Sequence, residues 1–326
     1  VGRGSVQVCL FDNDKLVTTQ NIRIGNLRIR EKVADFSRET LHTEEMVEEL
    51  INNDLESFKK MYLKDRKIEN IMLIGDVFTD SVYQNIEEKT TKIISRENFN
   101  TWYEKIIRQS PMELAVKLGI PLENASLMYP SAVIYKCLID MMEAEHVWIP
   151  GVHMTRGIAY EYAEQMKLQK GSHNFENDIL VASRNIAKRY SSGKNHIAGT
   201  TDVALDIFDS TRKIHGMGKR ERLLLQIAVL LHDCGKYISM SEVAECSYRI
   251  IMATEIIGLS TEERQVIASA VRYNTREFGC YEEINRETSM NRENYLLTAK
   301  LTAILRLANA MDRSHYQKVK GIKTAL

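Results

Sequence analysis

Residues 229–238 read VLLHDCGKYI, and this stretch decides how the second half of the chain is interpreted. It closes a helical pattern, Arg220–Leu231, whose apolar residues recur at spacings that place them on one face. His232 and Asp233 follow directly. An imidazole nitrogen and a carboxylate oxygen are both ligands for divalent metals. The end of this helix therefore predicts either a metal site or a plain hydrogen-bonded His–Asp pair.

A metal site at this position needs ligands from other segments, because adjacent side chains on a regular helix diverge. His196 lies at the start of another helical pattern, HIAGTTDVALDIF, and is the expected first ligand. Gly235 is expected to end the helix and to let backbone approach a ligand. Lys236 would then reach an anion.

The second half of the chain is predicted to be an all-α domain. Beyond a polar linker, residues 167–174, nearly every segment shows helical periodicity, so we place a domain boundary near residue 170. The expected helices are Ile179–Tyr190, His196–His215, Lys219–His232, Ser241–Gly258, Ser260–Tyr273 and Asn294–Arg313.

The first half alternates β-rich and helical patterns, which predicts an α/β layer structure with a mixed sheet. Strands are expected at Val6–Phe11, Leu16–Gly25, Leu27–Val33, Ile68–Gly75, Thr91–Ser95 and His146–Pro150. Helices are expected at Thr43–Tyr62, Phe99–Gln109, Pro111–Gly119, Pro130–Ala144 and Gly157–Lys167.

Composition limits the classes of partner and compartment. The 326 residues carry 44 Lys+Arg and 44 Asp+Glu, so only a local basic patch would attract a polyanion. Five cysteines stand apart without a CxxC pair, which favours free thiols in a reducing compartment. Because no apolar run reaches membrane-spanning length, we expect a cytoplasmic protein without a membrane partner. The abrupt start, VGRGSVQVCLF, leads us to expect a fragment.

The order of His196 and the His232–Asp233 pair resembles the HD superfamily of metal-dependent phosphohydrolases. That pattern is a lone His, an HD pair and a distant Asp, all on helices. The distant Asp falls at Asn309 in the segment LANAMD, and Asp312 lies one helical turn away as a substitute. The resemblance thus implies a divalent metal held by His196, His232 and Asp233, with Asn309 or Asp312 as a fourth position.

Three further positions bear on this resemblance. A neutral amide at Asn309 predicts weaker metal binding than a carboxylate would give. Cys246 and Asn274 stand where other members of the superfamily add histidines, so a second metal is not expected.

The segments ERLLLQIAVLLHDCGK and AILRLANAMDRSH also resemble the exopolyphosphatase/guanosine pentaphosphate phosphohydrolase (Ppx/GppA) family. This resemblance implies a second actin-like (ribonuclease H-like) lobe in residues 1–168 and an HD-type helical domain in residues 169–326. The family's first lobe carries a phosphate loop and the acidic residue that activates water, and it would lie upstream. The catalytic residues are therefore unknown from this chain.

A glycine turn of the family, DIGGGSTE, corresponds to the first residues here. Gly2, Arg3, Gly4 and Ser5 fit it, with arginine at the middle glycine. Glycines let backbone N–H groups face a phosphate, and arginine can bind one directly. A plain hairpin end is the alternative. Gln7 stands where the family has glutamate, and an amide cannot act as a base.

A second phosphate loop, GTGGT in the family, corresponds to the residues after IENIMLIG. Only Gly75 and Thr79 fit, because Val77 and Phe78 replace glycines, and an ordinary strand-to-helix turn is the alternative. The phosphate-binding residues that the resemblance implies are Gly2, Arg3, Gly4, Ser5, Gly75 and Lys236.

Three functions stay open, and so does the question of whether the chain is an enzyme. The first is a Ppx/GppA-like phosphohydrolase that cleaves phosphoanhydride bonds of inorganic polyphosphate or guanosine polyphosphate with Mg²⁺. The second is a noncatalytic regulatory protein that binds polyphosphate or a nucleotide. The third is an HD-type metal-dependent phosphohydrolase. No nucleic acid is indicated, and a homodimer is left open.

Overall fold

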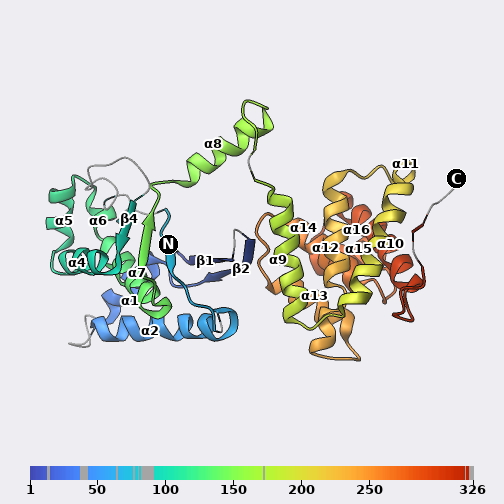
Figure 1. Cartoon of the computed structure of the whole chain (residues 1–326), viewed down its shortest axis with the longest axis horizontal. Helices are drawn as coiled ribbons and strands as arrows, with labels where there is room; N and C mark the ends of the chain where they lie inside the picture. Colours follow the sequence, from blue (N-terminus) through green and yellow to red (C-terminus); the bar gives the residue numbers. More distant parts are fainter. Residues whose placement is uncertain are drawn as a thin grey trace. The chain divides into compact units, whose positions relative to one another are not determined.

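The computed structural model describes residues 1–12, 15–36, 43–63, 65–75, 78–79, 81, 92–171, 173–319 and 321–322. The chain forms two compact units (Figure 1). The first comprises Val1–Val8 and Gln20–Ser172, and the second comprises Cys9–Thr19 and His173–Leu326. The first unit is mixed α/β and residues 173–322 of the second unit are helical where structured, as the sequence predicts. The hairpin residues Cys9–Thr19 group with the second unit, whereas the sequence analysis assigns them to the first domain.

The strands of the first unit form a small mixed sheet. Its order is β3 (Asn70–Met72), β5 (His146–Ile149), β4 (Lys92–Ser95), with β3 parallel and β4 antiparallel to β5. The strands β1 (Val6–Asp12) and β2 (Lys15–Ile22) pair only with each other among the described strands. The mixed sheet is therefore confirmed, but the N-terminal hairpin is a separate two-stranded sheet.

The predicted strand Leu27–Val33 is wrong, because this segment lies in helix α1 (Asn26–Phe36). Leu27 and Ile29 alternate with arginines, which fits a strand, but Asn26, Ile29 and Arg30 have helical spacing and make the inward contacts. Asn26 is buried and its side-chain amide donates to Ser131 Oγ at 3.0 Å. The segment forms a helix because the helical spacing places both apolar and polar contacts on one face.

Helix α7 (Met128–Met142) is the central core element of the first unit, with eleven of its fifteen residues buried. Its Tyr135 ring lies 5.2 Å from Phe78, and Phe78 lies 6.0 Å from Phe99. The other helical elements are α2 (Thr43–Phe58), π-helix η1 (Lys59–Leu63), α4 (Arg96–Ile107), α5 (Pro111–Leu118), α6 (Leu122–Ala125) and α8 (Met154–Gln165).

The second unit packs its helices around α12 (Lys219–Leu231), which contacts α9, α10, α14 and α16. The sequence predicts one apolar face on α12, and the structure buries Leu225, Ala228 and Val229 as well. Burial therefore extends beyond that face, while Lys219 stays exposed and Arg222 and Gln226 are partly buried. The surrounding helical elements are α9 (Phe175–Arg189), α10 (Lys194–Ser210), α11 (Arg212–His215), 3₁₀-helix η2 (Cys234–Tyr237), α13 (Val243–Ala253), α14 (Thr261–Arg272), α15 (Tyr281–Thr288) and α16 (Arg292–Met311).

Helix α15 is absent from the sequence prediction. Its segment, YEEINRET, is short and contains two apolar residues, Tyr281 and Ile284, of which only Ile284 is buried, so its helical pattern is easily missed. No described helix is long and apolar enough to cross a membrane.

Candidate metal centre

The end of α12 is distorted in a way that lets two adjacent side chains converge. His232 keeps helical angles, but Asp233 has φ −104° and ψ 0°, and the 3₁₀-helix η2 follows at once. This turn breaks the regular helix, in which neighbouring side chains diverge. His196 comes from the first turn of α10, whose packing on α12 brings the two helices together.

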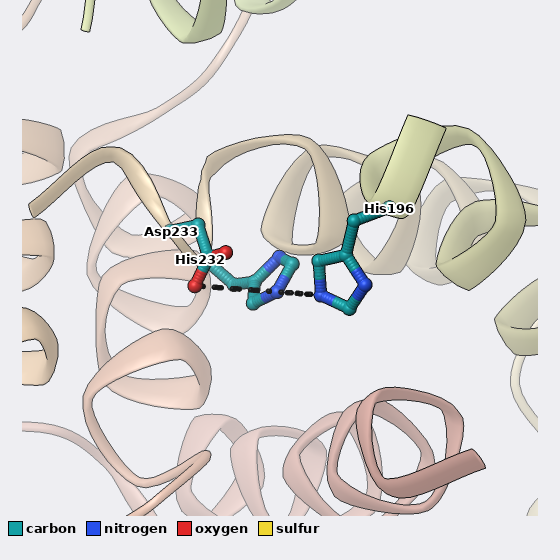
Figure 2. Close-up of side chains that lie close together, drawn as sticks. All are labelled: His196, His232 and Asp233. Atoms are coloured by element: carbon teal, nitrogen blue, oxygen red, sulfur yellow. Dashed lines mark hydrogen bonds and ion pairs between the residues drawn. The ribbon is translucent and has the colours of Figure 1, made fainter. Parts of the chain in front are cut away.

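The three side chains form a buried cluster, which we call the His–His–Asp cluster (His196, His232 and Asp233; Figure 2). His196 Nε2 lies 3.3 Å from His232 Nε2, and His232 Nε2 lies 3.6 Å from Asp233 Oδ1. One ligand atom from each residue lies within 4.8 Å of the others. Their exposed fractions are 3%, 3% and 8%, so the donor atoms are largely screened from water.

Hydrogen bonds on the far edges of both rings fix which nitrogens face each other. The Nδ1 of His232 lies 2.7 Å from the carbonyl oxygen of Val229, which can only accept, so Nδ1 carries the proton. The Nδ1 of His196 lies 2.8 Å from Asp312 Oδ2, and a carboxylate again accepts. The two Nε2 atoms lie 3.3 Å apart, and each would present a lone pair in a ring that carries its single proton on Nδ1.

Burial and neighbouring charges shift the pKa values of His232, Asp233 and Asp312. Burial lowers the pKa of His232, with Asp233 and the Val229 carbonyl opposing in part, so the ring stays neutral. Burial acts to raise the pKa of Asp233, but the His232 ring and the hydrogen bond from Lys236 outweigh it, and the pKa lies below its ordinary value. Burial also acts to raise the pKa of Asp312, but the hydrogen bonds from His196 and Gln317 outweigh this effect, so the pKa lies below its ordinary value.

The donor set fits a divalent transition metal. Two facing nitrogen lone pairs repel unless a cation lies between them, and a carboxylate oxygen completes a three-sided site. Imidazole nitrogens suit Zn, Fe or Mn better than Mg, which prefers oxygen ligands. His196, His232 and Asp233 would hold such an ion, and three protein ligands leave further positions for water or substrate.

The fourth position expected from the sequence is arranged differently. Asp312 is 3% exposed and contacts Nδ1 of His196, on the ring edge away from the cluster, and it is not among the three clustered residues. Asn309 is half-buried on α16. In this structure Asp312 therefore contacts the outer edge of the His196 ring and does not lie among the three clustered donor atoms.

Gly235 and Lys236 have structural partners. A Cβ on Gly235 would lie 2.2 Å from the Val243 carbonyl oxygen and 2.6 Å from the Ser247 amide nitrogen, so glycine allows η2 to touch α13. Gly235 therefore serves close helix packing, and its approach to a ligand stays a prediction. The ammonium group of Lys236 donates to Asp233 Oδ2, so an anion would compete with that contact.

The N-terminal glycine turn uses part of its own hydrogen-bonding capacity. The Gly2 amide donates to the Ser5 carbonyl at 2.8 Å, and the amides of Asn26 and Leu27 donate to the carbonyls of Gly2 and Arg3. Gly4 is exposed. The guanidinium of Arg3 is exposed and lies 3.6 Å from Glu123 Oε1.

Gly75 follows β3 and has φ +92°, a left-handed conformation that favours glycine. It is exposed, while Thr79 is buried. Val77, which replaces a glycine of the family's GTGGT loop, lies outside the described residues.

Two residues near the cluster were not identified from the sequence. The His315 ring stacks on His196, with centroids 3.8 Å apart and planes 10° from parallel. Gln317 donates to Asp312 through its backbone and its side chain. No spacing rule would have found them, because the segment beyond α16 has no periodic pattern.

All five cysteines are free thiols. Cys234 is fully buried, and burial raises the pKa of its thiol to about 12, so it is an inert filler at neutral pH.

The chain combines an α/β unit that has a glycine turn with a helical unit that holds the buried His–His–Asp cluster. The sequence resemblance to phosphohydrolases implies this combination. Residues 1–166 match the model of the Ppx/GppA phosphatase family, and residues 181–325 match the model of Ppx/GppA phosphatase, domain III. The chain belongs to the Ppx/GppA phosphatase family.

A solved structure, the type II crystal variant of the Aquifex aeolicus Ppx/GppA phosphatase, is similar at 13% identity with a TM-score of 0.41. The similarity covers 48% of this chain and 53% of that chain. No curated protein sequence matches the chain.

Proposed function

We propose that this chain is part of a phosphohydrolase that cleaves phosphoanhydride bonds of inorganic polyphosphate or guanosine polyphosphate. The observation that carries the proposal is the match of both units to phosphatase family models, over residues 1–166 and 181–325.

The finer assignments rest on the sequence resemblance. Residues 1–168 would be a second actin-like lobe and residues 169–326 an HD-type helical domain. Phosphate groups would contact the exposed Arg3 side chain and the turn around it, with Gly75 and Lys236 as further predicted contacts. Mg²⁺ would accompany the phosphates, whose oxygen atoms suit it. The five free thiols favour action in the cytoplasm.

A second candidate function is metal-dependent phosphohydrolysis at the His–His–Asp cluster. The specific observation in its favour is the approach of the two Nε2 atoms to 3.3 Å beside Asp233, with both Nδ1 atoms against hydrogen-bond acceptors. A bound divalent ion would supply charge stabilisation for a phosphoryl group and lower the pKa of water. In this proposal His196 and His232 would present lone pairs to the ion, and Asp312 and the Val229 carbonyl would accept hydrogen bonds from their Nδ1 atoms.

Phosphate release separates these candidates. The protein in its full encoded length is incubated with polyphosphate or guanosine pentaphosphate, first with Mg²⁺ and then with Mn²⁺ or Zn²⁺. Release that survives His232→Ala supports the first candidate, and release that this variant abolishes supports the second. His173→Ala, at an exposed histidine of the same unit, is the matched control.

No release from either substrate under any metal contradicts both enzymatic proposals. Polyphosphate binding without release would then support the noncatalytic alternative, which Gln7 and Asn309 favour because amides replace carboxylates there.

A further inference from the structure

The segment Asp312–Gln317, just beyond α16, contacts the His196 ring on its edge and its face. Asp312 Oδ2 accepts from Nδ1 at 2.8 Å, and the exposed His315 ring lies on the face of His196 at 3.8 Å. The ring of His196 is thus oriented by one residue of this segment and covered by another.

Gln317 holds the segment in place. Its backbone amide donates to Asp312 Oδ1 at 2.8 Å, and its side-chain amide donates to Asp312 Oδ2 at 3.2 Å and to the His315 carbonyl at 2.7 Å. His315 and Gln317 have φ of +57° and +47°. Non-glycine residues adopt this left-handed region at a free-energy cost, which the surrounding contacts must offset.

The neighbouring helix is shaped to receive Gln317. Gly199 lies on α10, three residues after His196, and a Cβ there would lie 2.8 Å from Gln317 Cγ and 3.8 Å from Asp312 Oδ2. A larger residue at position 199 would displace the side chain that supports Asp312. Three separate features, the hydrogen bonds, the left-handed backbone and the glycine, therefore converge on one carboxylate.

We infer that Asp312 is a positioning residue that keeps the proton of His196 on Nδ1, with Gln317 as its support, so that Nε2 presents a lone pair to the cluster. The inference rests on the second candidate of the proposed function, the metal centre, and it assigns Asp312 a role other than the ligand role implied by the family resemblance.

The proton position matters because a competing donor is close. The Thr200 hydroxyl lies 3.4 Å from the same Nδ1. Without a carboxylate, this hydroxyl can donate to Nδ1, which would favour the proton on Nε2. A protonated Nε2 cannot bind a metal, so Asp312 selects the ligating form of the ring.

The direct test is the tautomer of His196 in the metal-free chain, measured by nitrogen–carbon correlation NMR with assigned histidines. The wild type is expected to carry Nδ1–H. In Asp312→Asn the amide can itself donate to Nδ1, so the signal is expected to move to the Nε2–H form. The control is Asp209→Asn. Asp209 lies on α10, the helix of His196, and pairs with Arg222 at the surface, so this variant is expected to leave the signal unchanged.

Metal affinity gives the second readout, by calorimetric titration with Zn²⁺ and with Co²⁺. Loss of such a supporting contact weakens metal binding by about 10–100-fold, and this loss is expected for Asp312→Asn. Gln317→Ala and Gly199→Ala are expected to fall between this variant and the wild type. Gln317→Ala keeps the test usable if Asp312→Asn does not fold.

The outcomes are separable. A wild-type ring with Nε2–H, or an unchanged tautomer in the folded variants, overturns the positioning role even if the metal binds. A wild type with Nδ1–H that shifts in the variants, but binds neither metal, keeps the positioning role and removes the metal centre.

Discussion

The Gly2–Ser5 turn and the His–His–Asp cluster are both polar sites, but they differ in what each leaves available for a ligand. In the turn, the Gly2 amide and the carbonyls of Gly2 and Arg3 already have backbone partners. In the cluster, the outward Nδ1 atoms are satisfied and the inward Nε2 atoms face each other. These backbone hydrogen bonds occupy part of the turn, whereas the two Nε2 atoms of the cluster lie close together at its centre, where we predict that a cation binds.

Exposure adds to this difference. Arg3 is largely in water, where salt weakens its attraction to anions. The cluster residues are at least nine-tenths buried, so a cation bound there would be little screened. We expect substitutions in the cluster to have larger effects on ligand affinity than substitutions in the turn.

The largest effect is expected for His232→Ala. Removing one of three donors should lower Zn²⁺ affinity by more than about 100-fold, beyond the loss for a supporting residue. Calorimetry on the purified chain measures this, with His173→Ala as the control. Equal affinities in the two variants would remove the distinction between the cluster and the rest of the surface.

Gly235→Ala is expected to destabilise the second unit by about 1–3 kcal/mol, because the new Cβ collides with the backbone of α13. Urea unfolding monitored by circular dichroism gives the change. Gly157→Ala is the matched control, since nothing lies within 4 Å of its added Cβ, and alanine in a helix is expected to be neutral or stabilising. A destabilised control with an unaffected Gly235→Ala would contradict the packing.

A smaller, pH-dependent effect is expected at Asp140 in the first unit. Burial acts to raise the pKa of Asp140, but hydrogen bonds from Lys136 and Arg96 outweigh it, and the pKa is lowered. The carboxylate therefore stabilises the fold above its unfolded pKa of about 3.9, and this contribution is lost as pH falls through the folded value.

The stability difference between wild type and Asp140→Asn should be under about 1 kcal/mol at pH 7, because the pair is partly exposed, and it should shrink toward pH 3. Urea unfolding across this range measures it, and Asp54→Asn, at an exposed aspartate, is the control. A difference that grows on acidification would reverse the assigned sign.

The smallest effect is expected for Arg3→Ala. An exposed ion pair contributes up to about 1 kcal/mol, so polyphosphate affinity should fall by no more than about 5-fold, and less at high salt. Fluorescence anisotropy with labelled polyphosphate measures this. A loss near 100-fold would make the turn a stronger anion site than its hydrogen bonds indicate.

The sequence predicts most helices of the second unit because burial of α12 and its neighbours leaves a strong apolar pattern. It fails at Leu27–Val33, where strand and helix spacings coincide, and at α15, whose eight residues contain only two apolar side chains.

In the site, the resemblance brings His196 and His232–Asp233 into one hypothesis, and the structure places their donor atoms together, while their metal role stays a prediction. The contact of Asp312 with Nδ1, and the left-handed residues His315 and Gln317 that surround it, could not be predicted. They depend on side-chain contacts across 116 residues and on backbone angles that no periodicity encodes.

The most direct measurement is the anomalous X-ray scattering of crystals soaked with Zn²⁺ and collected at the zinc absorption edge. The account predicts one strong peak at the cluster, about 2.0–2.1 Å from Nε2 of both His196 and His232 and about 2.0–2.2 Å from a carboxylate oxygen of Asp233. A peak bound elsewhere, or no peak beside these two nitrogens at saturating zinc, would contradict it.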